Sequence, residues 1–331
     1  MNKRGIVEVQ LHWVFVMIAG AVILAFFIGI VAKQRAASES NIVFNVKNDL
    51  NLLITGSKVS SGIVPLDIYD YEFDFSCNEY TIQNQRQSLL GKPVFAAEKI
   101  KGGKILLWSV PWKFPFKIDN ILYATSPKIR YIFLGNSDEI YGEIPFSINK
   151  VLASDLNALQ DEGDYAIRLV VFSAAQGQLY IPNWMKKYDV SAVIVQPQAS
   201  MYNEIQGNLQ FYQYDKTGWK LEGNSKYFTQ EGLLGAVFSQ NLNDYNCVMA
   251  NAVAELNAVS SIYLDRIKLI YDAGVCPLFY GTENQFLVSS LASATETKEN
   301  WQNNVEIMLD AKQKIENLNR DIQYQSCPVI Y

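Results

Sequence analysis

The sequence is poor in the residues on which much enzyme chemistry depends. Its 331 residues include a single histidine, His12, and only 18% of the residues are charged. Ser-His-Asp triads, Cys-His dyads and histidine-rich zinc sites each need an imidazole in a cleft. The G-x-G-x-x-G, Walker A and G-x-S-x-G motifs are also missing. We therefore predict no catalytic residue, no metal ligand and no cofactor, and the sequence favours a protein that is not an enzyme.

Basic residues are scarce as well. The formal net charge is −5, so the chain lacks the basic footprint of a nucleic-acid-binding protein, and no nucleic-acid partner is expected. The charge is unevenly distributed, because residues 36–331 hold 24 basic and 32 acidic residues and therefore carry a net charge of −8. The hydrophobic share of 49% is typical of a folded chain.

What the sequence does contain is one long apolar stretch without charge, from Trp13 to Ala32. Twenty helical residues are about 30 Å long, which is the thickness of the hydrocarbon layer of a bilayer. Trp13 at one end and Lys33 and Arg35 at the other suit the two membrane interfaces. A cleaved secretory signal is the alternative, but its apolar region usually spans only about 7–15 residues. The stretch therefore predicts a retained transmembrane helix that contacts the lipid bilayer through residues 13–32.

The charges that flank this helix do not by themselves determine its orientation in the membrane. Lys3 and Arg4 accompany Glu8 on one side, and Lys33 and Arg35 follow on the other, so the positive charge is nearly balanced. The short N-terminal segment is typical of a signal-anchor, and the even number of cysteines, four, suits an oxidising compartment. We expect a single-pass protein of the cell membrane whose C-terminal body is extracytoplasmic.

The predicted fold class of the whole chain is α+β. It comprises an N-terminal transmembrane helix, an antiparallel β region, a small Rossmann-like α/β unit and a C-terminal antiparallel helical pair. The predicted segments are a cytoplasmic tail (1–12), the transmembrane helix (13–32), a juxtamembrane amphipathic helix and linker (33–62), the antiparallel β region (63–127), the α/β unit with a β-hairpin (128–240) and a helical hairpin packed on the body (241–331).

The transmembrane helix is expected to continue beyond the membrane. Val43, Val46, Leu50 and Leu53 follow a heptad a/d spacing, which predicts one helix of about fifty residues. Two heptads are too few for an independent coiled coil. This apolar stripe is therefore predicted to contact the body, a protein partner or a second copy of the chain.

Alternation and β-branched runs predict the strands of the body. Residues 69–75 alternate aromatic and acidic side chains, and Gly102-Gly103 between two apolar runs predicts a hairpin. Short apolar runs predict buried strands, and the turn at 215–218 predicts a second hairpin. The apolar runs are Ile129–Leu134, Ile167–Phe172 and Val190–Val195.

The four cysteines are predicted to form two disulfides. Amphipathic patterns indicate helices over 243–271 and 297–322, and two consecutive helices pack antiparallel most simply. In that packing Cys247, at the start of the first helix, meets Cys327, just past the end of the second. This leaves Cys77 to pair with Cys276.

Carboxylates provide the weak candidates for a ligand site. Asp138, Glu139 and Glu143 follow the first buried strand, at the carboxyl end where α/β units often bind ligands. Asp70, Glu72 and Asp74 alternate along residues 69–75 and offer oxygens to a hard cation, although carboxylates two residues apart on one strand lie about 7 Å apart. A solvated acidic surface is the simpler interpretation of both groups.

The N-terminal region carries two resemblances. Lys3-Arg4-Gly5, the long apolar helix, its amphipathic continuation and a β-rich body resemble archaeal type IV pilin-like proteins, although Glu8, Gln10 and His12 interrupt the start of the apolar run. That resemblance implies cleavage after Gly5 and helices stacked in a filament. Lys-Arg-Gly followed by the segment 12–15 and a single span is also similar to uncharacterised single-span archaeal membrane proteins, which implies a location and no activity.

Three functions remain open at this point. The first is a membrane-anchored extracytoplasmic protein with a structural or protein-interaction role in the cell envelope. The second is a pilin-like filament subunit, whose mature N-terminus would be Ile6 rather than Met1. The third is an anchored enzyme or ligand receptor that uses the carboxylates around 138–143.

Overall fold

A computed structural model describes residues 4–57, 60–89, 91–161, 163, 166–172, 180–199, 205–296 and 298–331. The side chains of residues 4–12, and with them His12, lie outside this description, as do those of residues 36, 39, 283, 298 and 299. The chain divides into two compact units, residues 1–51 and 52–331.

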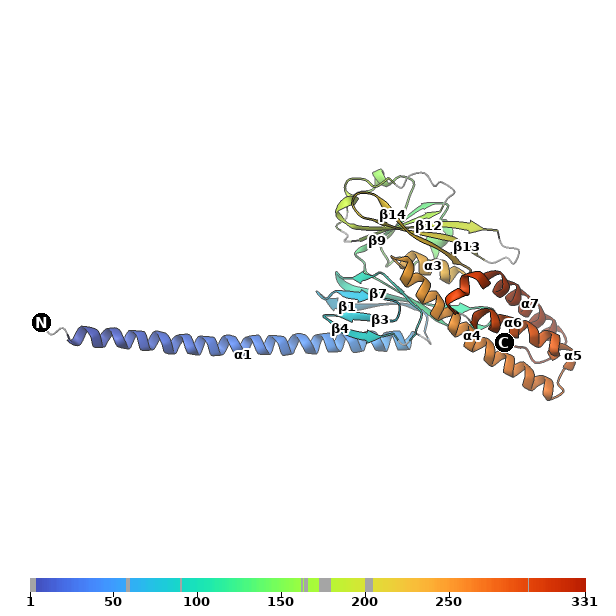
Figure 1. The fold of residues 1–331 in the computed structure, drawn as a ribbon, viewed down its shortest axis with the longest axis horizontal. Coiled ribbons are helices and arrows are strands. Elements are labelled where there is room, and N and C mark those ends of the chain that lie inside the picture. The colour runs from blue at the N-terminus through green and yellow to red at the C-terminus, as the bar shows by residue number, and fades with distance from the viewer. Residues whose placement is uncertain are drawn as a thin grey trace. The chain divides into compact units, whose positions relative to one another are not determined.

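A single helix, α1, runs from Arg4 to Gly56 (Figure 1), so the predicted helix of about fifty residues is confirmed. Most of the predicted N-terminal tail is part of this helix. Its apolar side chains are exposed over the predicted span, where Trp13, Phe15 and Met17 are 70%, 70% and 71% exposed. Over this span α1 is apolar on all sides, and none of its faces is buried. The helix is therefore long and apolar enough to cross a membrane.

The body begins with two four-stranded sheets. Sheet A has the order β1-β7-β8-β5, and sheet B has the order β4-β3-β2-β6. Sheet A consists of β1 (Gly62–Tyr69), β7 (Gly103–Lys113), β8 (Lys117–Thr125) and β5 (Val94–Ala96). Sheet B consists of β4 (Gln85–Ser88), β3 (Glu79–Ile82), β2 (Phe73–Phe75) and β6 (Lys99–Ile100). All these pairings are antiparallel except that of β5 with β8.

Two local predictions in this region were wrong. The alternating stretch 69–75 is not one strand, because Tyr69 ends β1 with a positive φ of 52° and β2 begins only at Phe73. The hairpin at Gly102-Gly103 does not form either, since β6 pairs with β2 while β7 pairs with β1 and β8. The strands pair with distant strands rather than with each other, although the local sequence favours a turn. The two glycines connect β6 of sheet B to β7 of sheet A.

Sheet C has six strands in the order β10-β9-β11-β12-β13-β14. Its first four strands are parallel, and β13 and β14 continue it antiparallel. The strands are β10 (Lys150–Ala153), β9 (Ile129–Gly135), β11 (Ala166–Phe172), β12 (Asp189–Gln198), β13 (Gln206–Tyr214) and β14 (Trp219–Tyr227). The three predicted buried strands and the second hairpin are confirmed. All seven residues of β11 are buried, as expected for a strand covered on both faces.

The helical elements in the described parts of the connections between the parallel strands are short. They are helix α2 (Asp138–Glu143) and the 3₁₀ turns η1 (Leu156–Ala158) and η2 (Met185–Lys187). The body is therefore a mixed α+β fold with largely antiparallel sheets and C-terminal helices.

Helix α3 (Gln230–Phe238) lies between sheets A and C (Figure 1). Every residue from Gly232 to Phe238 is buried. The Tyr123 hydroxyl of β8 donates to the carbonyl of Glu231 over 2.8 Å, and Arg168 of β11 donates to that of Ala236, also over 2.8 Å. A helix that is buried all round belongs to a core, so α3 joins the two sheets into one hydrophobic interior.

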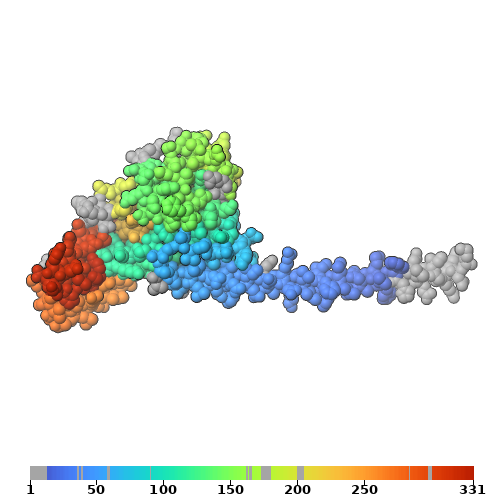
Figure 2. Space-filling view, turned by 180° about the vertical axis from the view of Figure 1, so that it is seen from behind, coloured from blue at the N-terminus to red at the C-terminus, as the bar shows by residue number. Residues whose placement is uncertain are grey.

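The C-terminal helices form one end of the body (Figure 2). They are α4 (Leu242–Asp272), α5 (Pro277–Tyr280), α6 (Thr282–Glu296), the 3₁₀ segment η3 (Lys298–Asn304) and α7 (Val305–Tyr324). Helix α4 is also long and apolar enough for a span, but 33% of its apolar window is buried, and Tyr245, Val248 and Leu256 are fully packed core residues.

The predicted antiparallel pair is wrong, because α6 lies between the two expected helices and packs on both α4 and α7. Gln302, which precedes α7, donates to Asn246 near the start of α4 over 3.0 Å, so α7 starts beside the start of α4 and runs parallel to it. The end of α7 therefore meets the end of α4, and Cys276 pairs with Cys327, with Cα atoms 6.2 Å apart. Cys247 at the other end of α4 pairs with Cys77, with Cα atoms 5.8 Å apart. All four cysteines are bonded, but the predicted pairing of Cys247 with Cys327 and of Cys77 with Cys276 was wrong.

Candidate functional site

A cavity of about 310 Å³ lies at the carboxyl edge of sheet C. Its walls come from the segment that follows β9, from the last residues of β11 and β12, from the start of β13, from the end of β14 and from α3. The lining residues are Asn136, Ser137, Glu139, Ile140, Phe172, Pro197, Gln198, Ile205, Gln206, Tyr227 and Leu233. The volume is at the small end of the range of about 300–1,000 Å³ that small-molecule sites occupy.

Gly135 determines the direction that the backbone takes at this edge of sheet C. It ends β9 with φ of 81°, and a Cβ atom on it would lie 1.7 Å from the carbonyl oxygen of Phe172 at the end of β11. Only glycine combines this backbone conformation with so close an approach. The turn places Asn136 and Ser137 over the strand ends and starts α2 beside the cavity.

Three polar residues that line the cavity are almost completely buried. Ser137 is 1% exposed, Gln206 is 6% exposed and Tyr227 is 1% exposed. The Ser137 hydroxyl makes only a long contact of 3.4 Å with the carbonyl of Gly135. Burial raises the pKa of Tyr227 to about 12, so its hydroxyl is protonated and available as a donor at neutral pH. The three side chains therefore give the cavity neutral hydrogen-bonding groups.

The structure separates the three carboxylates predicted at this edge. All three are exposed residues of α2, but only Glu139 lines the cavity. Asp138 and Glu143 are outside the lining. Among the described lining residues Glu139 is the one carboxylate, and that lining contains neither lysine nor arginine. The cavity therefore combines apolar walls, neutral hydrogen-bonding groups and one negative charge.

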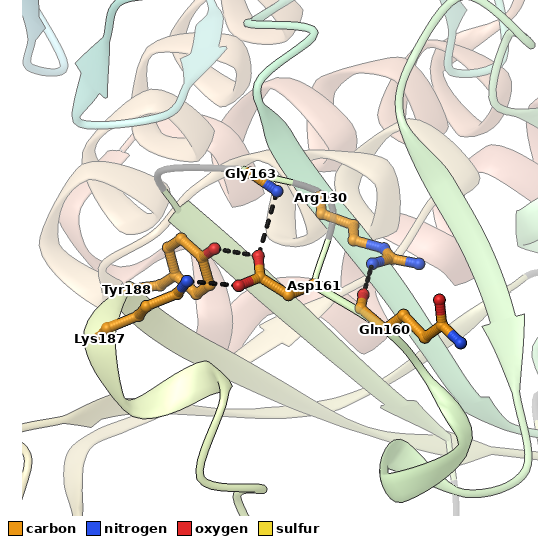
Figure 3. Close-up of polar contacts among 6 residues, drawn as sticks. All are labelled: Arg130, Gln160, Asp161, Gly163, Lys187 and Tyr188. Carbon is orange, nitrogen blue, oxygen red and sulfur yellow. Dashed lines mark hydrogen bonds and ion pairs between the residues drawn. The ribbon is translucent and has the colours of Figure 1, made fainter.

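A second polar cluster lies at the opposite, amino-terminal edge of the same strands (Figure 3). The Asp161 carboxylate accepts hydrogen bonds from the Lys187 ammonium, from the Tyr188 hydroxyl and, over 3.1 Å, from the backbone N–H of Gly163. Nearby, Arg130 donates to the carbonyl of Gln160 over 2.7 Å. These contacts hold the segment that precedes β11 against the segment that precedes β12. The cluster is therefore a clamp for the sheet, away from the cavity.

We expect the Lys187→Gln variant to raise the pKa of Asp161. The hydrogen bond from Lys187, followed by that from Tyr188, lowers this pKa from 3.8 to about 2. Because the pKa is depressed in the folded state, the contribution to stability is present above about pH 4 and is lost as the pH falls towards 2. Titration of the side-chain carboxyl carbon by NMR measures the change. Lys186→Gln alters the neighbouring lysine and is the matched control, and an equal shift in both variants would contradict the assignment.

Arg168, on the central strand β11, is completely buried. It donates to the carbonyls of Ala236 and Gln240 at the C-terminal end of α3, over 2.8 and 3.2 Å, and its guanidinium carbon lies 5.3 Å from the centre of the Phe211 ring. Burial lowers its pKa to about 9. The negative end of a helix dipole and an aromatic face compensate a buried cation. Arg168 therefore secures α3 to sheet C.

Three of the four acidic residues at 67–74, namely Asp67, Glu72 and Asp74, form ion pairs with lysines. Glu72 lies 3.5 Å from Lys99 and 3.9 Å from Lys101, Asp74 lies 3.9 Å from Lys99, and Asp67 lies 3.7 Å from Lys104. Within the described part of the chain, no three histidine, cysteine, aspartate or glutamate side chains are grouped as metal ligands. These carboxylates form an exposed, ion-paired surface.

Comparison with known proteins provides no further identification. No protein-family model matches this chain, and neither the curated proteins nor the solved structures searched gave a match. The function must therefore be inferred from the site and from the chain's organisation.

The sequence pattern predicts one residue of the cavity lining, Glu139, but not the residues that β13 and β14 contribute. Glu139 was predicted because it follows a buried strand at its carboxyl end. Gln206 and Tyr227 come from β13 and β14, 67 and 88 residues further along the chain, and no local pattern connects them with Glu139. The only available signal was the hairpin at 215–218, which places the two residues on adjacent strands.

Proposed function

We propose that this chain is a single-pass membrane protein that carries a disulfide-braced binding body outside the cytoplasm. The observation that supports this proposal best is the pairing of all four cysteines in a chain with an apolar N-terminal helix. Disulfides persist in oxidising compartments and are rare in a reducing cytosol. Residues 13–32 would anchor the protein in the lipid bilayer.

The role of the body is proposed to be ligand recognition. The strands β9 and β11 lie side by side, and their chain connections lead away in opposite directions, to β10 and to β12. In a Rossmann-like unit the crevice at such a point is where ligands bind. The cavity at this edge, with Glu139 and three buried polar side chains, favours a receptor-like binding module over an envelope protein without a ligand.

An interaction with another protein is the second candidate, favoured by exposed apolar side chains on the C-terminal helices. Ile262 and Leu269 on α4, Leu278 on α5 and Phe286 on α6 are 66%, 71%, 85% and 68% exposed. The three helices contact one another, and exposed apolar side chains on neighbouring helices can contribute to a protein interaction site.

The orientation is tested by fusing reporters to Tyr331. An alkaline phosphatase fusion is expected to be active and a green fluorescent protein fusion dark, because the first folds only after export and the second only in the cytoplasm. A maleimide-polyethylene glycol reagent should modify no cysteine of the denatured protein before reduction and four after it. A fluorescent fusion together with four free thiols would contradict the proposed location.

A further inference from the structure

We propose that the cavity at the carboxyl edge of sheet C binds a small organic ammonium ion with an apolar substituent. This inference rests on the proposed binding function and assigns its ligand class. Each of three properties of the lining, its charge, its aromatic rings and its buried hydrogen-bonding groups, restricts the ligand independently.

The charge of the lining selects against anions. Glu139 is the one carboxylate among the described lining residues, and no lysine or arginine faces it there. The surrounding body also carries an excess of acidic residues, with a net charge of −8 over residues 36–331. An acidic cleft attracts cations and repels phosphates and carboxylates.

The aromatic side chains favour an ammonium ion of organic character over a metal ion. Phe172 and Tyr227 line the cavity together with the aliphatic Ile140, Ile205 and Leu233. An aromatic ring attracts an ammonium group through its negative face, and apolar walls need an apolar group to fill them. A hydrated metal ion would leave this surface uncovered.

The buried polar groups provide directional contacts for the N–H groups or for a further polar atom of the ligand. The amide of Gln206 and the hydroxyl of Ser137 offer acceptors, and the Tyr227 hydroxyl is protonated at neutral pH. Glu139 would then pair with the ammonium group at the mouth, where its side chain is exposed. The small volume of about 310 Å³ restricts the ligand to a molecule of metabolite size.

Three probes of one carbon skeleton test the ligand class: 2-phenylethylamine, 2-phenylethanol and phenylacetate. Equilibrium dialysis uses the full chain in nanodiscs of zwitterionic phosphatidylcholine, with empty nanodiscs as the partition background. We expect the amine to bind about fivefold more tightly than the alcohol, and phenylacetate to bind more weakly than both.

Two matched variants replace glutamates of α2, and a third replaces the last residue of β12. Glu139→Gln should reduce the affinity for the amine about fivefold, to that for the alcohol, whereas Glu143→Gln should leave it unchanged because Glu143 is outside the cavity. Gln198→Trp, at an exposed lining position, should occlude the cavity and abolish binding of all three probes. Circular dichroism confirms that each variant is folded.

The outcomes separate the ligand class from the binding function. If Gln198→Trp abolishes binding while the amine has no advantage over phenylacetate, or while Glu139→Gln leaves that advantage intact, the cavity is a binding site and the ammonium assignment is overturned. If the probes do not bind the wild type, or if Gln198→Trp does not weaken them, the site itself is overturned. The membrane orientation is tested separately by the reporter fusions and does not affect this measurement.

Discussion

Replacing Cys77 and Cys247 together by alanine is expected to lower the free energy of unfolding of the body by about 5 kcal/mol at 25 °C. The two cysteines are 170 residues apart in the sequence. A crosslink over such a long segment removes a large part of the conformational entropy of the unfolded chain. The loss is of the same order as the whole stability of a typical domain, so this variant should be folded only marginally.

The second disulfide provides the matched comparison. Cys276 and Cys327 are 51 residues apart, and the same entropy argument gives about 4 kcal/mol for their replacement by alanine. Urea unfolding in detergent, followed by tryptophan fluorescence, measures both losses. An equal loss in the two double variants, or a larger one for Cys276 and Cys327, would contradict the argument from chain entropy.

Hydrogen exchange provides a second and local measurement of the effect of the Cys77–Cys247 disulfide. Cys77 follows β2 of sheet B, and its backbone N–H donates to Asp244 of α4 over 3.2 Å. The strands of sheet B are only two to four residues long, so their attachment to α4 depends strongly on the crosslink. We expect the amides of residues 79–88 to exchange faster when the Cys77–Cys247 bond is absent and to remain unaffected by loss of the other bond.

The elements that could be predicted are those whose signal is local. The apolar run of α1, the β-branched runs of β9, β11 and β12, and the turn at 215–218 each contain their own evidence within about twenty residues. For the three strands, the β-branched side-chain pattern agrees with the environment, because these strands are buried on both faces.

The elements that could not be predicted depend on contacts between distant residues. Helix α6 is rich in serine and threonine and shows only a weak amphipathic pattern, although Val288 and Leu291 on it are completely buried. Missing this helix reverses the relative direction of α4 and α7, and the wrong disulfide pairing follows from that single error. The cavity is non-local in the same way, because Glu139 and Tyr227 meet only when six strands are arranged in order.

Gly135→Ala is expected to cost about 2–5 kcal/mol of stability. The positive φ of 81° at Gly135 disfavours any residue with a Cβ atom by about 1–2 kcal/mol. The added methyl group would also lie 1.7 Å from the carbonyl oxygen of Phe172, and relieving such a contact requires backbone shifts that typically cost about 1–3 kcal/mol. Because this oxygen belongs to the backbone of a buried strand, it cannot avoid the methyl group by a side-chain rotation.

The same substitution connects the stability of sheet C with its proposed site. Moving β9 away from β11 displaces Ser137 and Glu139, which follow Gly135 directly, so any folded fraction of the variant should bind 2-phenylethylamine more weakly than the wild type. Gly142→Ala is the matched control, because a Cβ atom there meets nothing within 4 Å and alanine favours a helix by up to about 1 kcal/mol over glycine. Thermal unfolding of both variants measures the difference. A Gly135→Ala protein as stable as Gly142→Ala would show that the turn after β9 tolerates a side chain, and the geometry proposed for the carboxyl edge of sheet C would then be wrong.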